Sequence, residues 1–316
     1  MKNILLFGGT GTLGSELVNY IKIHTNDINL IIINHDELDL TSYGHVKSKI
    51  TDINSKIKLD FIINCTAITD TVSIEKYDRI KNVSYMVNSL VPKYISYVCN
   101  ELNIKFIHFS TDYVFSEYSK KTCTGYDEFP VNIYGYHKLI GELFIKNNMD
   151  IHNYMIIRIG WIYGVYNERS FIHKFIKNVC TRLNNNEDIY VIDDQISTPT
   201  STLFISEQLI EIINDNKYGT FSILPSGVVT KYDYAMKILY IIKNIFNIEK
   251  FNNVKIFRSK TDHTNIQYPL NSSLYKFSDI VYNTNISWEQ DLLRYMIMYR
   301  NKFIQFIDKQ LNGNII

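Results

Sequence analysis

The residues best suited to acid–base chemistry are Tyr134 and Lys138, which lie four positions apart in the segment YGYHK. Side chains at this spacing share one face of a helix, where they can interact. A free tyrosine titrates near ~10, and we expect a neighbouring ammonium to lower the pKa of the phenol. The pair predicts a proton donor, although the same spacing also occurs on exposed amphipathic helices, and the chain has 24 tyrosines.

A glycine-rich turn near the N-terminus predicts a dinucleotide site. Residues 2–7 (KNILLF) have the pattern of a buried strand, and Gly8, Gly11 and Gly14 follow it before a helical segment. This spacing allows a tight turn, close approach of a pyrophosphate to bare backbone, and close packing of the helix on the sheet. The N-terminus of that helix supplies the anion site. Because strand, turn and helix occur in this order, we favour a dinucleotide site over a structural loop.

Composition excludes several classes of protein. The chain has 316 residues, 46% of them hydrophobic, which is enough for one or two domains with a large core. A formal net charge of +1 gives no electrostatic reason to expect nucleic acid or an anionic membrane as partner. No stretch approaches the ~20 apolar residues of a membrane span, and the first apolar run is too short for a secretory signal. We expect a cytoplasmic protein that binds small molecules.

The four cysteines are Cys65, Cys99, Cys123 and Cys180, and they are widely scattered. They form no Cys-x-x-Cys pair, and the histidines are not clustered. The sequence therefore predicts neither a metal site nor a disulfide framework.

The first half of the chain alternates short apolar runs with longer segments. After the strand at 2–7, we expect strands at 29–34, 61–65, 105–110 and 154–159, separated by crossover helices. Apolar strands of this kind form a parallel sheet that is covered on both faces. The sequence predicts an α/β fold, with a Rossmann-type doubly wound parallel sheet over residues 1–165.

The second half is less regular and predicts a smaller C-terminal substrate-binding lobe over residues 166–316. Some of its segments are expected to return and pack on the Rossmann domain. The expected elements are a short strand at 189–192 and helices at 171–183, 203–213, 232–246 and after Trp288.

Eight blocks occur in order along the chain: ILLFGGTGTLGSEL, ELDLTS, FIINCTAIT, FIHFSTDYVF, NIYGYHKLIGE, IIRIGWIYG, VIDDQISTPT and PLNSSL. Through these blocks the chain resembles the dTDP-4-dehydrorhamnose reductase family of extended short-chain dehydrogenases. The resemblance implies NAD(P)H-dependent reduction of the C4 ketone of a 4-keto-6-deoxy sugar nucleotide. The substrate it implies is dTDP- or UDP-4-dehydro-L-rhamnose, and the product is the L-rhamnose nucleotide.

The resemblance also implies roles for single residues. Thr111 completes a catalytic triad with Tyr134 and Lys138 and hydrogen-bonds the substrate carbonyl. Tyr134 is the general acid, while Lys138 lowers its pKa and holds the ribose. Asp112 and Trp161 are expected to contact the sugar. From the residues alone, the Thr-Asp pair predicts a helix cap or turn, and the tryptophan predicts a core residue.

The implied cofactor is NADPH or NADH. At the end of the second strand an acidic residue selects NADH and an arginine accommodates NADPH. This chain has Asn34 and His35 there, which exclude neither cofactor, and a histidine near basic residues tolerates a 2′-phosphate, so we favour NADPH slightly. From the residues alone, Asp39 and Leu40 predict a solvated cap and a core leucine. The implied cofactor-binding residues are Gly8, Gly11, Thr12, Leu13, Gly14, Asn34, Asp39, Leu40, Ala67, Ile68, Thr69, Tyr134 and Lys138.

Several positions depart from the family pattern. Val72 occupies a position that is usually acidic, and Tyr268 and Ser273 stand where arginines often flank the PLNSSL block. Both changes affect how the nucleotide diphosphate is held. Glu16 matches a glutamate that holds magnesium at a dimer interface in some relatives, but it lacks a convincing set of partners. We therefore predict no required metal, and a homodimer stays open.

Two alternatives also stay open. A bifunctional 3,5-epimerase/4-reductase needs a further acid–base group, typically a cysteine at position 112 or 113, where this chain has aspartate and tyrosine. His173 and Lys174 are the remaining candidates for that acid, although they also fit a polar helix face. The second alternative is a non-catalytic, cofactor-binding regulatory subunit like the β subunit of methionine adenosyltransferase, which the triad does not exclude.

Overall fold

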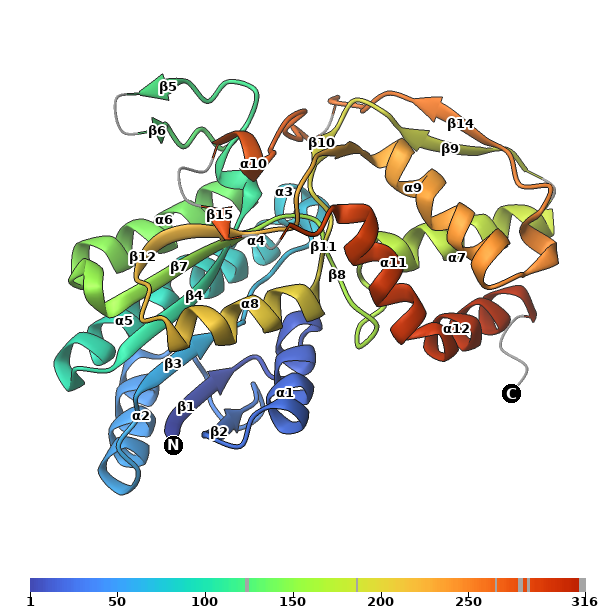
Figure 1. The fold of residues 1–316 in the computed structure, drawn as a ribbon. Coiled ribbons are helices and arrows are strands. Elements are labelled where there is room, and N and C mark those ends of the chain that lie inside the picture. The colour runs from blue at the N-terminus through green and yellow to red at the C-terminus, as the bar shows by residue number, and fades with distance from the viewer. Residues whose placement is uncertain (123–124, 186, 265, 278–280, 283–284, 313–316) are drawn as a thin grey trace.

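The computed structural model describes residues 1–122, 125–185, 187–264, 266–277, 281–282 and 285–312. Its centre is a seven-stranded parallel sheet with the order β15-β12-β7-β4-β3-β1-β2 (Figure 1). The strands are β1 (Lys2–Phe7), β2 (Ile28–Ile33), β3 (Phe61–Asn64), β4 (Lys105–Thr111), β7 (Tyr154–Ile159), β12 (Gly219–Ile223) and β15 (Val281–Tyr282).

The predicted doubly wound sheet is confirmed, and the five predicted strands agree with the observed ones to within about a residue at each end. The chain runs from β1 outward to β2 and then returns to the other side of β1 to form β3. Ligands of doubly wound sheets bind where the strand order reverses in this way. The carboxyl ends of β1 and β3 are therefore the expected cofactor side.

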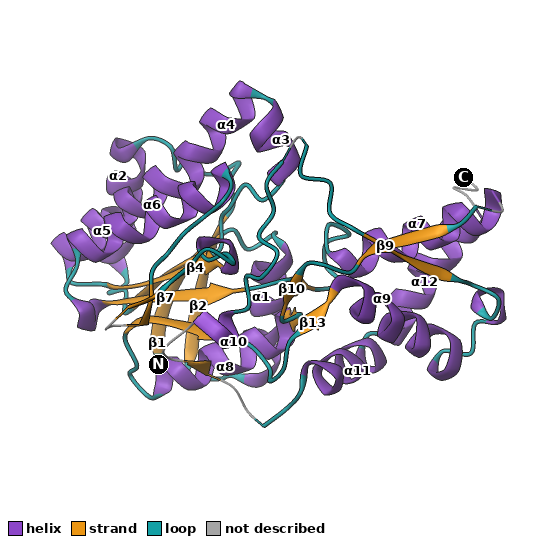
Figure 2. Ribbon diagram, turned by 90° about the horizontal axis from the view of Figure 1, so that it is seen from above, coloured by secondary structure: helices purple, strands orange, loops and turns teal. Residues whose placement is uncertain are grey.

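Alternate residues of β1 enter two different cores. Ile4 and Leu6 pack with residues of α1 (Thr12–His24) and α8 (Thr202–Asn214). Leu5 and Phe7 pack on the opposite face with residues of α2 (Tyr43–Lys56), α5 (Val91–Leu102) and α6 (Ile133–Asn148). Figure 2 shows α2, α5 and α6 together on one side of the strands, with α8 on the other. This two-sided burial explains the uninterrupted apolar strands of the sequence.

Polar side chains fix where several helices begin. The side chain of Ser42 caps α2, Asn132 caps α6 and Ser201 caps α8, each by accepting a backbone N–H bond. Thr230 caps α9 (Lys231–Tyr240) in the same way. Ser287 begins α11 (Trp288–Met298) with a reciprocal capping box.

The C-terminal part of the chain forms a second group of elements around its own apolar core, to the right of the sheet in Figure 1. Its main elements are α7 (Phe171–Asn185), β9 (Ile189–Ile192), α9, β14 (Ile256–Ser259), α11 and α12 (Arg300–Asn312). Strands β12 and β15 also come from beyond residue 165, so both halves of the chain contribute to the sheet.

The remaining elements are short. They are α3 (Thr71–Lys76), α4 (Asp78–Tyr85), a π-helical segment (Met86–Leu90), β5 (Lys121–Thr122), β6 (Gly125–Tyr126), β8 (Ile162–Tyr163), β10 (Ile196–Ser197), β11 (Thr200–Ser201), β13 (Val229–Thr230), a second π-helical segment (Ile241–Ile245), α10 (Leu274–Phe277), and 3₁₀ turns at Asp112–Val114, Ile151–Asn153 and Glu249–Phe251.

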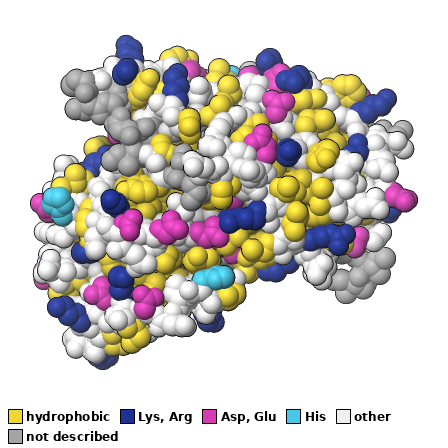
Figure 3. All heavy atoms as spheres, viewed as in Figure 1, with side chains coloured by type: hydrophobic (Ala, Val, Ile, Leu, Met, Phe, Trp, Pro, Cys, Tyr) yellow, Lys and Arg dark blue, Asp and Glu magenta, His cyan; other side chains and the backbone are white. Residues whose placement is uncertain are grey.

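The surface carries mixed charges. On the face shown in Figure 3, basic and acidic side chains are interspersed rather than segregated. None of the helices formed by the described residues is both long and apolar enough to span a bilayer. The thiols of Cys65, Cys99 and Cys180 are free, and Cys123 lies outside the described residues.

Candidate active site

The glycine turn has the geometry of an anion cradle. Gly8 follows β1 with φ +83°, a conformation that L side chains rarely adopt. A Cβ at Gly14 would lie 2.1 Å from the carbonyl oxygen of Gly8, so only glycine allows the helix to start this close to the strand. Gly11 precedes α1, and no side chain of the described residues caps this terminus. The first turn of α1 therefore presents its N–H groups toward the cofactor side of the sheet.

Two residues of this turn that were predicted to bind the cofactor differ in how far their side chains are exposed. Leu13 is buried in the core beneath α1, so only its backbone is available to a ligand. The Thr12 side chain is partly exposed, and its methyl group would lie 3.1 Å from a Cβ at Gly164. The turn thus adjoins the segment that follows β8.

Asn34 directly follows β2 and lies beside the glycine turn. Its Oδ1 is 3.8 Å from the position that a Cβ at Gly9 would take. This oxygen is buried and has no hydrogen-bond partner among the described residues. An unpartnered acceptor beside an anion cradle fits a cofactor whose adenosine ribose ends near β2.

Asp39 and Leu40 take the roles that the residues alone predict, a solvated cap and a core leucine. The Asp39 carboxylate accepts bonds from the backbone N and Oγ1 of Thr41, at 2.9 and 2.6 Å, and these bonds lower the pKa of Asp39. Leu40 is half-buried and packs on the core beside α2. Their contribution to an adenine pocket stays a prediction.

The loop after β3 contains the predicted residues Ala67, Ile68 and Thr69, and it is held by Asn88. The amide of Asn88 accepts a bond from the backbone N of Ile68 at 3.0 Å and donates one to its carbonyl oxygen at 2.9 Å. Asn88 is fully buried in the first π-helical segment. This pairing fixes the loop backbone while leaving the side chains of Ala67 and Thr69 exposed.

Thr111 and Tyr134 are brought together at the carboxyl end of β4. Thr111 is the last residue of β4, and Tyr134 lies in the first turn of α6. A Cβ at Gly135 would lie 2.4 Å from the carbonyl oxygen of Tyr113, so glycine is needed for α6 to pack on the turn after β4. The structure thus places two of the three triad residues within hydrogen-bonding reach of each other.

The predicted effect of Lys138 on Tyr134 is wrong for this structure. Burial raises the pKa of Tyr134 to about 12, a hydrogen bond with Thr111 opposes the rise, and the charge of Asp112 adds to it. Lys138 is not among these causes, because its side chain turns into the sheet. Its Nζ donates to the carbonyl oxygen of Phe109 at 2.6 Å. A raised pKa keeps the phenol protonated at neutral pH, which suits a proton donor.

Lys138 itself is almost completely buried. Its Nζ lies 3.2 Å from Nε2 of His108, a fully buried histidine in the middle of β4. Burial lowers the pKa of Lys138 to about 8, although the charges of Glu142 and Cys65 oppose the shift. The lysine therefore lies one helical turn from Tyr134 but beneath the surface of the site.

Asp112 is a buried carboxylate that is saturated with hydroxyl donors. Its Oδ2 accepts bonds from Ser197 at 2.8 Å and Ser272 at 2.6 Å, and its Oδ1 accepts one from Thr111 at 3.2 Å. Burial raises the pKa of Asp112 to about 6 against the effect of these bonds. Its predicted contact with the sugar stays a prediction.

Trp161 follows β7 and has φ +38°, in the left-handed region. The indole is partly exposed, although it also packs against the C-terminal core. Non-glycine residues in this region are uncommon, and they concentrate at ligand sites. This conformation supports the predicted ligand role over that of a simple core residue.

Neither of two charged candidates from the sequence is arranged as a metal ligand or an acid. Glu16 is buried and accepts bonds from the hydroxyls of Thr202, Tyr295 and Tyr299. Within the described part of the chain, no group of three or more histidine, cysteine, aspartate or glutamate side chains is arranged to hold a metal. His173 is buried in contact with two phenylalanine rings of α12, which agrees with a structural role.

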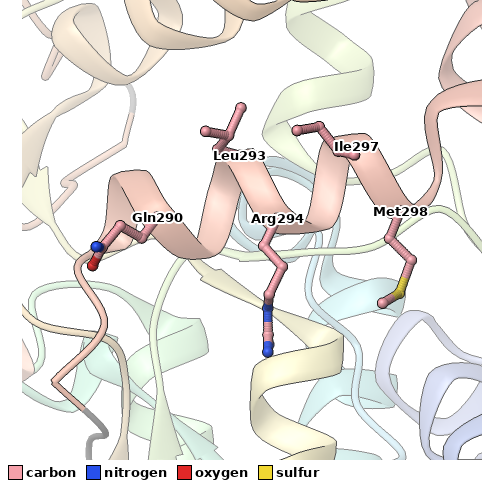
Figure 4. Close-up of a pocket in the computed structure, with 5 residues that line it drawn as sticks. All are labelled: Gln290, Leu293, Arg294, Ile297 and Met298. Atoms are coloured by element: carbon pink, nitrogen blue, oxygen red, sulfur yellow. The ribbon is translucent and has the colours of Figure 1, made fainter.

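Two shallow surface depressions lie away from Tyr134. One of about 540 Å³ follows α11 and is lined by Gln290, Leu293, Arg294, Ile297 and Met298 (Figure 4). The other, of about 530 Å³, lies between the segment after β2 and α2, and four of its eight lining residues are acidic. The second depression adjoins the predicted ribose end of the cofactor site.

Comparison with known proteins decides the family. The model of the RmlD substrate binding domain family matches residues 1–300. The chain belongs to this family. A relative named dTDP-4-keto-6-deoxy-D-glucose reductase, from Streptomyces niveus, is 29% identical over 236 residues, which is 73% of this chain and 75% of the relative.

Solved structures of the family agree in fold. A dTDP-4-dehydrorhamnose reductase from Clostridium acetobutylicum superposes with a TM-score of 0.77 and 25% identity, covering 94% of this chain and 99% of that one. The corresponding enzyme from Bacillus anthracis, solved in complex with NADP, gives a TM-score of 0.75 and 25% identity, covering 94% and 100%.

Several residues of this RmlD-family site were missed by reasoning from the sequence. Ser197 and Ser272 lie inside two of the family blocks, and only their common contact with Asp112 shows that these blocks meet. Asn88 and His108 had no local signal, because a polar residue within an apolar element does not reveal its partner. Lys231 is the first residue of α9 and lies near Trp161, with no motif around it.

Proposed function

We propose that this protein uses NADH or NADPH to reduce the C4 ketone of a 4-keto-6-deoxy sugar nucleotide. The substrate is dTDP- or UDP-4-dehydro-L-rhamnose, and the product is the L-rhamnose nucleotide. The observation that carries the proposal is the meeting of the Thr111 and Tyr134 hydroxyls at the end of β4, one helical turn from Lys138. Membership of the RmlD family and the names of the relatives support the same reaction.

Each residue of the proposed site has a separate role in the reduction. A reduced nicotinamide, when bound, supplies a hydride. Tyr134 donates its proton to the oxygen that becomes an alkoxide at C4. The Thr111 hydroxyl, which donates to Oδ1 of Asp112 in the free protein, would donate to the same C4 oxygen when the substrate is bound. The glycine turn and Asn34 hold the dinucleotide. Contact of Lys138 with the nicotinamide ribose requires its buried ammonium to leave the carbonyl oxygen of Phe109 when the cofactor binds. The serines on Asp112 keep that carboxylate in place beside Thr111.

Turnover by the purified protein tests the proposal. The 4-keto-L-sugar nucleotide is incubated with NADH or NADPH, and loss of reduced-cofactor absorbance is followed together with formation of the rhamnose nucleotide. Turnover separates the enzyme from a non-catalytic regulatory subunit, which would bind the cofactor and leave the sugar unchanged. The proposal includes a cytoplasmic location, and light scattering of the purified protein determines whether it is a homodimer.

A further inference from the structure

Lys231 is a partly buried lysine at the start of α9. Its Nζ donates to Oε1 of Gln195, and its backbone N donates to the carbonyl oxygen of the same residue at 3.3 Å. Gln195 immediately precedes β10, which contains Ser197, and the hydroxyl of Ser197 donates a hydrogen bond to Asp112. These contacts hold the ammonium on the side of the C-terminal part that faces the proposed active site.

Two aromatic rings border this ammonium. Nζ lies 5.5 Å from the centre of the Trp161 ring and 5.9 Å from that of Tyr268. Both distances allow a cation–π interaction. Trp161 also has the left-handed backbone conformation that residues other than glycine rarely adopt.

Lys231 has no neighbouring carboxylate in the described part of the chain that could balance its charge. Among the described residues it makes no ion pair within 4.0 Å. Asp112 and Asp194 attract the ammonium from farther away, and Lys174 repels it. Asp112 already accepts hydrogen bonds from three hydroxyl groups. A partly buried cation that has no ion-pair partner among the described residues is unfavourable, so the arrangement favours an anionic ligand.

We propose that Lys231, bordered by Trp161 and Tyr268, binds the diphosphate of the nucleotide-sugar substrate. This inference rests on the proposed function. The charge of such a substrate lies on its diphosphate at C1, across the sugar ring from C4, so its cation must lie near Tyr134 without contacting it. Lys231 meets that requirement, because it contacts Gln195, two residues before Ser197, whose hydroxyl donates to Asp112. The segment from Tyr268 to Leu274 contains no lysine or arginine that could serve instead.

The experiment compares Lys231→Met with Lys231→Arg, and Lys237→Met on the same helix is the matched control. Calorimetry measures binding of dTDP, UDP and the free nucleosides, with NADH binding as the test of folding. Lys231→Met should weaken diphosphate binding by about 10- to 100-fold, the usual effect of losing one charge-assisted bond. Nucleoside and NADH binding should change by less than about twofold, a negligible energy. Lys231→Arg should keep most of the diphosphate affinity, and Lys237→Met all of it.

The outcomes separate this inference from the proposed function. Equal dTDP and UDP affinity in Lys231→Met and the unmodified protein would overturn the inference, even if sugar reduction proceeds. Loss of diphosphate affinity in a protein that reduces no 4-keto sugar would support the anion subsite and refute the proposed reaction. In an active enzyme, Lys231→Met should raise KM for the sugar nucleotide far more than it lowers kcat.

Discussion

Nε2 of His108 lies 3.2 Å from Nζ of Lys138, and Nδ1 of the same ring lies 3.2 Å from Nδ2 of Asn64. The amide of Asn64 is oriented by Thr66, whose backbone N and hydroxyl both donate to Oδ1. This orientation directs Nδ2 of Asn64, which can only donate, toward the His108 ring. Nδ1 of His108 must therefore accept that hydrogen bond, and the proton of the neutral ring lies on Nε2. Burial lowers the pKa of Lys138. We expect this tautomer to act in the same direction, because an Nε2–H donor pairs with a neutral Lys138 and opposes the ammonium.

Asn64→Asp should therefore raise the pKa of Lys138. A carboxylate accepts from Nδ1, which frees Nε2 to accept from the ammonium, and its charge favours the same state. In the unmodified protein, kcat/KM should fall as pH rises through about 8, where Lys138 loses its proton. Asn64→Asp should move that fall upward by about one to two pH units. The profiles are measured in a Lys231→Arg background, because Lys231 also has a pKa of about 8 and a guanidinium does not titrate there. An unchanged profile would contradict this network.

Tyr134→Phe should lower the rate of reduction by about two to four orders of magnitude, because it removes only the proton donor. Cofactor binding should survive, since the ring remains in α6. Tyr136→Phe is the control, because Tyr136 is on the same helix with its side chain exposed. Single-turnover rates and cofactor titration measure the two effects. Near-normal turnover in Tyr134→Phe would mean that another group is the acid.

Short sequence patterns correctly predicted the features that depend only on neighbouring residues, namely strands and the glycine turn. The bounds of the five predicted strands follow from apolar runs, and the turn from Gly8 to Gly14 follows from the backbone space that it needs. The path of the Lys138 side chain could not be predicted, because it depends on where β4 places His108 and the carbonyl of Phe109.

Contacts between segments that are distant in the sequence also could not be predicted. Ser272 lies 160 residues from Asp112, and no spacing rule joins them. The family blocks identified both segments without assigning them to one another.

The protein alone should not exchange the C3 and C5 protons of the 4-keto-6-deoxy-D-glucose nucleotide. Exchange needs a base beside a carbon α to the ketone and a second group on the opposite face. Position 112 holds a saturated aspartate, and His173 is packed against Phe303 and Phe306. Incubation in deuterated water without reductant, followed by mass spectrometry, tests this. Incorporated deuterium would favour the bifunctional enzyme and identify Lys174 as the next residue to replace.

Glu142→Gln should destabilise the fold by less than the about 3–5 kcal/mol that an unpaired buried charge costs, because the buried guanidinium of Arg158 keeps its second, partly exposed partner Glu128. Arg158 donates to both oxygens of Glu142, at 3.0 and 2.6 Å. Burial alone would raise the pKa of Glu142, but the charge and hydrogen bonds of Arg158, together with the charge of Lys146, outweigh burial and lower the pKa to about 2. The stabilisation is therefore complete above the unfolded pKa of ~4.3 and is lost as pH falls toward about 2. Chemical denaturation measures the loss, and Glu101→Gln, in an exposed pair with Lys47, should cost less than about 1 kcal/mol.

NADH should bind more tightly than NADPH, contrary to the slight preference that His35 suggests from the sequence. His35 lies 3.0 Å from the carboxylate of exposed Asp36, and Oε1 of Glu37 accepts the backbone N–H of Asn34 at 3.0 Å. An acidic group at the end of β2 accepts a ribose 2′-hydroxyl and repels a 2′-phosphate. A repulsion of ~1 kcal/mol corresponds to a preference of roughly fivefold to tenfold.

Titration of the protein with each cofactor measures this preference. Glu37→Gln should narrow the preference, whereas Glu187→Gln, remote in the C-terminal part, should leave it unchanged. Tighter binding of NADPH to the unmodified protein would show that the carboxylates after β2 do not face the ribose.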